Sequence, residues 1–92
     1  MKISNSIELL DWFKESVNID SDYSIAKLLG FSRQYVSQIR NGKIEFSDFK
    51  ALELAVLAKH PEPLKVVAAI EAAKEERAGN LDKAKLWREQ AA

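Results

Sequence analysis

The sequence predicts an all-α fold, a small helical domain of about five to six helices. Apolar residues recur at intervals of three and four along nearly the whole chain, which is typical of amphipathic helices, and no segment alternates like a strand. The 92 residues suffice for one modest hydrophobic core. A composition of 47% apolar and 30% charged residues is that of a folded chain rather than a disordered one.

Small polar residues mark the expected helix starts, because their side-chain oxygens accept hydrogen bonds from first-turn N–H groups. The expected N-caps are Asn5 (with Glu8 three residues later), Ser21 or Asp22, Ser32, Ser47 and Asn80. The expected helices span about residues 5–16, 22–29, 32–40, 48–60 and 62–78, with a last helix after Asn80. The fourth is apolar on most sides, so we expect it at the centre of the core.

The helix order divides the chain into two segments. Residues 1–60 hold the first four helices, and residues 61–92 form an extension of two limbs joined at Gly79-Asn80. Two such limbs fold as an antiparallel helical hairpin. This C-terminal hairpin either packs on the first segment or forms a homodimer surface.

The residue inventory argues against several function classes. Without Cys there is neither a disulfide nor a thiolate zinc site, and the single His60 is expected to interact with the dipole at the end of the fourth helix. No apolar run of about 18 residues occurs, and early acids do not fit a secretory signal, so we expect a cytoplasmic, nucleoid-associated protein without membrane contact. No nucleophile elbow, phosphate loop or metal-ligand spacing is present. We therefore expect no enzyme activity, cofactor, metal or small-molecule substrate.

One stretch is cleared of acidic residues, although the whole chain carries fourteen basic and fourteen acidic side chains. Between Asp22 and Glu45 there is no carboxylate side chain. The basic residues of this stretch are Lys27, Arg33, Arg40 and Lys43. The positive field is therefore local, which fits binding of a polyanion better than the zero net charge does.

The same stretch has the spacing of a helix-turn-helix. Ala26 is the small residue that lets the second of the two helices cross closely, and Gly30 supplies the backbone freedom that the turn requires. Val36 and Ile39, three residues apart, lie on the inward face of the following helix. These four residues are the expected core of the motif.

Opposite this inward face, the helix over residues 32–40 presents small polar side chains bordered by guanidinium groups. Glutamine pairs bidentately with adenine, and arginine pairs with guanine or phosphate, so the surface suits a DNA major groove. The expected base contacts are Arg33, Gln34, Ser37 and Gln38. The expected phosphate contacts toward the end of the helix are Arg40, Asn41 and Lys43. A carboxylate here would repel phosphate, which explains why acids are absent.

Residues 22–43 resemble the helix-turn-helix of the Cro/repressor (XRE-type) family of phages and bacteria. The matching positions are Ala26, Gly30, Ser32, Val36, Ile39 and Gly42. The resemblance implies a lambda-repressor-like domain over about residues 1–60, sequence-specific binding of double-stranded DNA, usually as a homodimer on a palindromic operator, and transcriptional control, here expected as repression. Family members often carry a phosphate-contacting Gln near the start of the second helix. This chain has Asp22-Tyr23 there, so we expect that contact from Tyr23 and Ser24.

Two alternatives stand beside this interpretation. The polar helix face is also compatible with plain solvent exposure, and the C-terminal hairpin is compatible with an antitoxin or phage protein-interaction module. A pure protein binder has no reason to exclude carboxylates from residues 23–44, which favours DNA binding.

Overall fold

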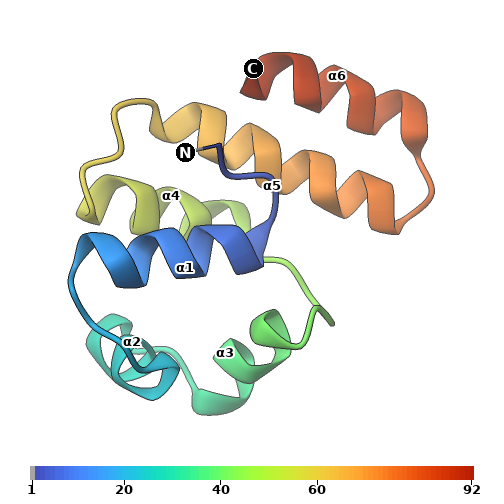
Figure 1. Cartoon of the computed structure of the whole chain (residues 1–92). Coiled ribbons are helices and arrows are strands. Elements are labelled where there is room, and N and C mark those ends of the chain that lie inside the picture. The colour runs from blue at the N-terminus through green and yellow to red at the C-terminus, as the bar shows by residue number, and fades with distance from the viewer. Residues whose placement is uncertain (1) are drawn as a thin grey trace.

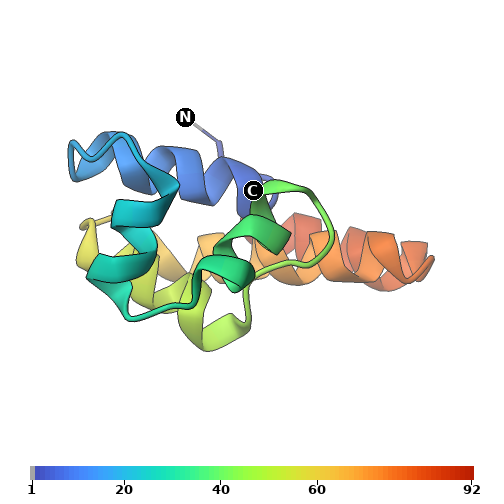
Figure 2. The same cartoon turned by 90° about the horizontal axis from the view of Figure 1, so that it is seen from below.

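The protein consists of six helices in a computed structural model that describes residues 2–92 (Figure 1). They are α1 Ser6–Ser16, α2 Asp22–Leu29, α3 Arg33–Arg40, α4 Asp48–Leu57, α5 Pro63–Arg77 and α6 Leu81–Ala91. No strand occurs in these residues, which confirms the all-α prediction. Helices α1 and α4 lie in the middle, α2 and α3 lie on one side of them, and α5 and α6 on the other (Figure 1). Seen from below, α5 and α6 extend to the right of α2 and α3 (Figure 2).

Side-chain caps start the first four helices where the sequence predicts. The cap oxygens accept backbone N–H bonds three residues ahead: Asn5 from Glu8 at 2.9 Å, Ser21 from Ser24 at 3.2 Å, Ser32 from Tyr35 at 3.0 Å, and Ser47 from Lys50 at 3.3 Å. Ser21, and not Asp22, is therefore the cap of α2. Asn80 is the N-cap residue of α6 as expected, but its side chain makes no capping bond.

Helix α4 ends earlier than expected, at Leu57 rather than at residue 60. Lys59 adopts a left-handed conformation with φ of 60°, and Pro61 disfavours a helical His60. The His60 side chain does not cap this helix. Its Nδ1 accepts the Glu62 N–H at 3.0 Å, and its ring packs edge-on against Trp12 with 5.1 Å between centroids.

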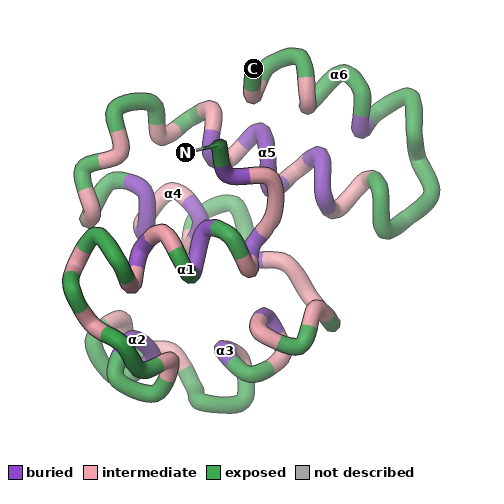
Figure 3. The backbone as a smooth tube through the Cα atoms, in the orientation of Figure 1, coloured by how far each residue is buried: buried purple, intermediate pink, exposed green. Residues whose placement is uncertain are grey.

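One hydrophobic core joins all parts of the chain except α6. Its largest fully buried side chains come from α1, α2, α3, α4, α5 and the segment before α4. They are Leu9, Leu10, Phe13, Ile25, Val36, Ile39, Phe46, Leu54 and Ile70. Purple stretches of the tube in Figure 3 mark the buried residues along the chain. Burying each such apolar side chain contributes about 1.5–3 kcal/mol before conformational entropy is subtracted. Ile70 and Val66 of α5 belong to this cluster, so the C-terminal hairpin completes the core of the first segment.

Helix α5, and not α4, is the most enclosed helix. It packs against both α4 and α6, and its buried residues are Val66, Ala68, Ala69, Ile70, Ala72 and Ala73. Helix α4 lies in the core as expected, with Ala51, Leu54 and Ala55 fully buried, but its other apolar side chains Phe49, Val56 and Leu57 are exposed. The small alanine side chains of α5 allow α4 and α6 to approach it from different sides.

Helices α2 and α3 form a helix-turn-helix with a three-residue turn. Gly30 ends α2 with φ of 71°, in the left-handed region that glycine adopts without a steric penalty. The Phe31 N–H then donates to the Ala26 carbonyl at 2.9 Å and closes the turn. Ala26, Val36 and Ile39 are each at most 2% exposed. The structure thus places the four predicted motif residues at the junction of the two helices.

Candidate nucleic-acid interface

The outer face of α3 carries exposed polar side chains and no carboxylate. Arg33, Gln34, Ser37 and Asn41 are exposed, whereas Val36 and Ile39 on the opposite face are buried in the core. A helix turns by about 100° per residue, which brings the four exposed residues to a single face. We call these four residues the outer face of α3.

Gln38 lies at the edge of this surface rather than in its centre. Its side chain is half-buried, beside the half-buried Tyr35. Tyr35 packs against Phe31 and Phe46 with ring centroids 5.6 and 6.0 Å apart, and its hydroxyl accepts the Ser47 N–H at 3.4 Å. Burial raises the pKa of the Tyr35 hydroxyl. Tyr35 is therefore a packing residue.

The N-terminal ends of α2 and α3 meet at Tyr23 and Arg33. The Arg33 guanidinium carbon lies 4.5 Å from the centroid of the Tyr23 ring, a cation–π geometry. Tyr23 is 54% exposed, and Ser24 beside it is also exposed. A predicted base contact and two predicted phosphate contacts thus lie together at one edge of the outer face.

Arg40 is engaged inside the protein. Its Nε and Nη2 donate to the Asp22 carboxylate at 2.9 and 3.0 Å, and Nη2 also lies 2.7 Å from Asp11 Oδ1. Lys14 Nζ donates to the same Asp22 carboxylate at 2.8 Å. This cluster ties α3 to α1 and α2, so the sequence-predicted phosphate contact of Arg40 competes with two carboxylates.

The cluster also changes the electrostatics of the surface. Hydrogen bonds from Arg40, followed by those from Lys14, lower the pKa of Asp22, so it stays ionised at neutral pH. The charge of Arg40 is balanced by Asp11 and Asp22, which the sequence places outside or at the border of the acid-free stretch. Among residues 2–92, Lys27, Arg33 and Lys43 form no ion pair. These three residues therefore carry the local positive field.

The turn after α3 holds Asn41 and Lys43, both exposed. Asn41 Nδ2 donates to Ser37 Oγ at 3.4 Å, which continues the outer face past the end of the helix. Lys43 N–H donates to the Gln38 carbonyl at 2.9 Å, and Gly42 adopts φ of 72°. The turn therefore presents two polar side chains from an ordered backbone.

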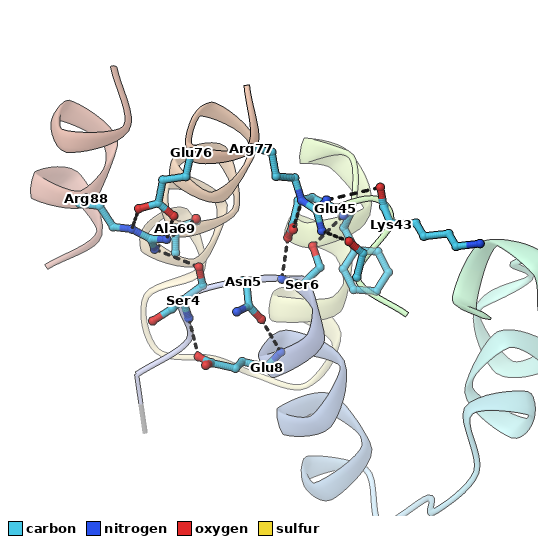
Figure 4. A network of polar contacts seen from close by, with 12 residues as sticks. Ser4, Asn5, Ser6, Glu8, Lys43, Glu45, Ala69, Glu76, Arg77 and Arg88 are labelled. Atoms are coloured by element: carbon cyan, nitrogen blue, oxygen red, sulfur yellow. Dashed lines mark hydrogen bonds and ion pairs between the residues drawn. The ribbon is translucent and has the colours of Figure 1, made fainter. Parts of the chain in front are cut away.

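Arg77 of α5 and Glu45 form polar contacts that hold the backbone of this turn (Figure 4). Arg77 donates to the carbonyl oxygens of Gly42 and Lys43 and, from Nε, to Glu45 Oε2 at 2.6 Å. Neither residue belongs to the helix-turn-helix pattern of the sequence. No local signal identifies them, because Arg77 lies 34 residues from Lys43 in the chain.

No candidate metal site accompanies this surface in the described part of the chain. Residues 2–92 contain no group of three His, Asp or Glu side chains placed to hold a metal ion. In the same part of the chain, none of the helices combines the length and apolar character that crossing a bilayer requires.

The comparisons with known proteins show that the chain is similar to a protein of a phage. No family model matches the chain, and no solved structure matches it. The uncharacterized protein Gp-c of Pseudoalteromonas phage PM2 is 56% identical over 92 residues, which is the full length of both chains. The chain therefore belongs to the same family as Gp-c of phage PM2.

Proposed function

We propose that this protein binds double-stranded DNA by placing α3 in the major groove, and that it regulates transcription as a repressor. The observation that carries the proposal is the outer face of α3, which is polar, free of carboxylates and backed by Val36 and Ile39 in the core. A helix about 10–12 Å in diameter fits a groove about 12 Å wide. Occlusion of RNA polymerase is the simplest consequence of such binding at a promoter.

The chemistry of the face supports base recognition. Arg33 and Gln34 lie in the first turn of α3, the end that enters the groove in helix-turn-helix proteins. Gln34 is suited to a bidentate contact with adenine and Arg33 to one with guanine. Ser37 lies one turn further along the same face, and Gln38 reaches the bases only from its edge.

The residues around this face are suited to phosphate contacts, which fix the register of the protein on the duplex. Tyr23 and Ser24 flank one end of α3, and Asn41 and Lys43 flank the other. Arg40 has a different role in this proposal: its ion pairs with Asp11 and Asp22 hold α3 against α1 and α2.

Selection of bound duplexes from a random pool tests the proposal. We expect an enriched sequence, and we expect Gln34→Ala to lose discrimination at one base pair by about 1–3 kcal/mol. Lys43→Ala should instead weaken binding to all sequences alike and reduce the slope of log K against log salt by about one unit. A pool that shows no enrichment and no retention at low salt would refute DNA binding.

A second candidate function, protein binding, is favoured by the exposed apolar side chains of α6. Leu81 and Leu86 are 69% and 63% exposed, and Trp87 is 37% exposed. These residues are available to a second copy of the chain, as a homodimer on a palindromic operator requires, or to an antitoxin-type protein partner. Sedimentation of the full chain and of Leu86→Glu separates these cases. A dimer at tens of micromolar that Leu86→Glu dissociates supports self-association, and a wild-type monomer on and off DNA excludes it.

A further inference from the structure

Arg77 bridges the C-terminal hairpin and the turn that follows α3. Its guanidinium donates to three acceptors in that turn: the Gly42 carbonyl, the Lys43 carbonyl at 3.4 Å, and Glu45 Oε2 at 2.6 Å (Figure 4). The planar fork of arginine satisfies several acceptors at fixed angles, which the single ammonium of lysine does not. The turn backbone is therefore fixed by a side chain from a helix that lies outside the helix-turn-helix.

Glu45 anchors the same turn from the other side. Its side chain is only 7% exposed, and its Oε1 accepts the Ser6 N–H at 2.9 Å at the start of α1. The Ser6 hydroxyl, in turn, accepts the Phe46 N–H at 2.7 Å. The segment over residues 42–46 is thus held between α1 and α5 by a continuous network of bonds.

The network leaves the side chains of Asn41 and Lys43 outside. Both are exposed, and neither takes part in the Arg77 or Glu45 bonds. Only the backbone beneath them is fixed, which is the arrangement that lowers the entropic cost of a later contact. Helix α3 does not need the Arg77 and Glu45 network in order to form, because Ser32 already caps it and Val36 and Ile39 already dock it in the core.

We infer that Arg77 is a positioning residue for DNA binding: it holds the turn so that Asn41 and Lys43 meet the phosphate backbone. This inference rests on the proposed function and adds a role for the C-terminal hairpin in it. Arg77 makes no contact with DNA in this scheme and acts through the backbone carbonyls of Gly42 and Lys43.

Two substitutions separate the effect of charge on DNA binding from the effect of positioning the turn. Arg77→Lys keeps the positive charge but loses the three-acceptor geometry. Glu45→Gln removes a negative charge near the site, so a pure charge effect would tighten DNA binding. The Gln carboxamide has a single oxygen, which accepts from either the Ser6 N–H or Arg77 but not both. If positioning matters, Glu45→Gln therefore weakens DNA binding.

Arg88→Lys is the matched control. Arg88 of α6 makes a similar set of bonds, to Glu76 at 2.7 Å, to the Ser4 carbonyl at 2.9 Å and to the Ala69 carbonyl at 3.5 Å, on the far side of the network (Figure 4). It touches no residue of the turn. The Arg88→Lys variant therefore shows how far a general weakening of the hairpin changes DNA binding.

Fluorescence anisotropy with a random-sequence 20-base-pair duplex at low salt measures the affinity of the four proteins. Arg77→Lys and Glu45→Gln should each weaken binding by roughly 3- to 10-fold, the size of a coupled contact, whereas Arg88→Lys should match wild type. In a Lys43→Ala background, Arg77→Lys should reduce the affinity by less, because the phosphate contact of Lys43 that Arg77 positions is already absent. Arg77→Lys binding as tightly as Arg88→Lys, or Glu45→Gln binding more tightly than wild type, would overturn the inference.

Amide hydrogen exchange measures, without DNA, how firmly Arg77 holds the turn. The Lys43 and Phe46 amides should exchange faster in Arg77→Lys than in wild type and should be unchanged in Arg88→Lys. Unchanged exchange in Arg77→Lys overturns the inference whether or not DNA binds. Faster exchange together with no duplex binding by the wild-type protein supports the ordering of the turn and refutes the proposed function alone.

Discussion

Asp22→Asn tests the ion-pair cluster that fixes α3 against the first two helices. The Asp22 carboxylate accepts bonds from Lys14 at 2.8 Å and from Arg40 at 2.9 and 3.0 Å. Hydrogen bonds to charged groups contribute about 1.5–3 kcal/mol when well shielded, and exposed ion pairs about 0.2–1 kcal/mol. The Asp22 and Arg40 side chains are 30% and 32% exposed, and Arg40 keeps Asp11 in the variant, so an intermediate value applies. We expect a loss of about 1–2 kcal/mol at pH 7.

The pH dependence of this loss follows from the lowered pKa of Asp22. The folded protein binds the Asp22 proton less tightly than the unfolded chain does, so the cluster contributes its full stability above the unfolded pKa of about 3.9. That contribution is lost as the pH falls through the lower pKa of the folded state. Protonated Asp22 then resembles Asn, and the two proteins should converge in stability at low pH.

Thermal unfolding followed by circular dichroism measures this difference. A loss of 1–2 kcal/mol should lower the Tm by about 5–15 °C at pH 7 for a domain of this size. Asp20→Asn is the control, because Asp20 is exposed and forms no ion pair among residues 2–92. Equal Tm values for Asp22→Asn and wild type at pH 7, or a full-sized gap that persists in acid, would refute the structural role of the cluster.

Four further substitutions test the turns at two glycines, the docking of α3 and its outer face. Gly30→Ala should cost about 1–2 kcal/mol in urea unfolding, because φ is 71° there while the added Cβ meets no atom within 4 Å. Gly79→Ala, with φ of 79° and the same open space, should cost a similar amount, and a gain in stability at either site would contradict the argument. Ile39→Val removes one methylene from a fully buried position and should cost about 0.5–1.5 kcal/mol. Ser37→Ala on the outer face should stay within about 0.5 kcal/mol of wild type, and a larger loss there would show that this face is not free surface.

The sequence predicts the helices well because their signals are local. Ser32 and Gly30 act through bonds or backbone angles within a few residues, and the spacing of Val36 and Ile39 defines the inward face of α3 directly. The same local patterns fail where the outcome depends on the packing of distant segments. The apolar α4 leaves Phe49 exposed, because α5 covers only part of its surface.

The candidate site shows the same division. The outer face of α3 follows from helical periodicity, whereas the engagement of Arg40 with Asp22 depends on a contact across 18 residues. The bond from Arg77 to the Lys43 carbonyl spans 34 residues, and the whole of α4 lies between the two positions in the chain. Neither contact has a local signal in the sequence, because both depend on how distant segments pack in the fold.

An amide chemical-shift titration of the full chain with duplex DNA at low salt tests the central claim most directly. We predict that the shifts concentrate on the outer face of α3, on Tyr23 and Ser24, and on the turn over residues 41–43. Shifts confined to α6, or no shifts at all under conditions that retain a known DNA-binding domain, would contradict the assignment of α3 to the DNA groove.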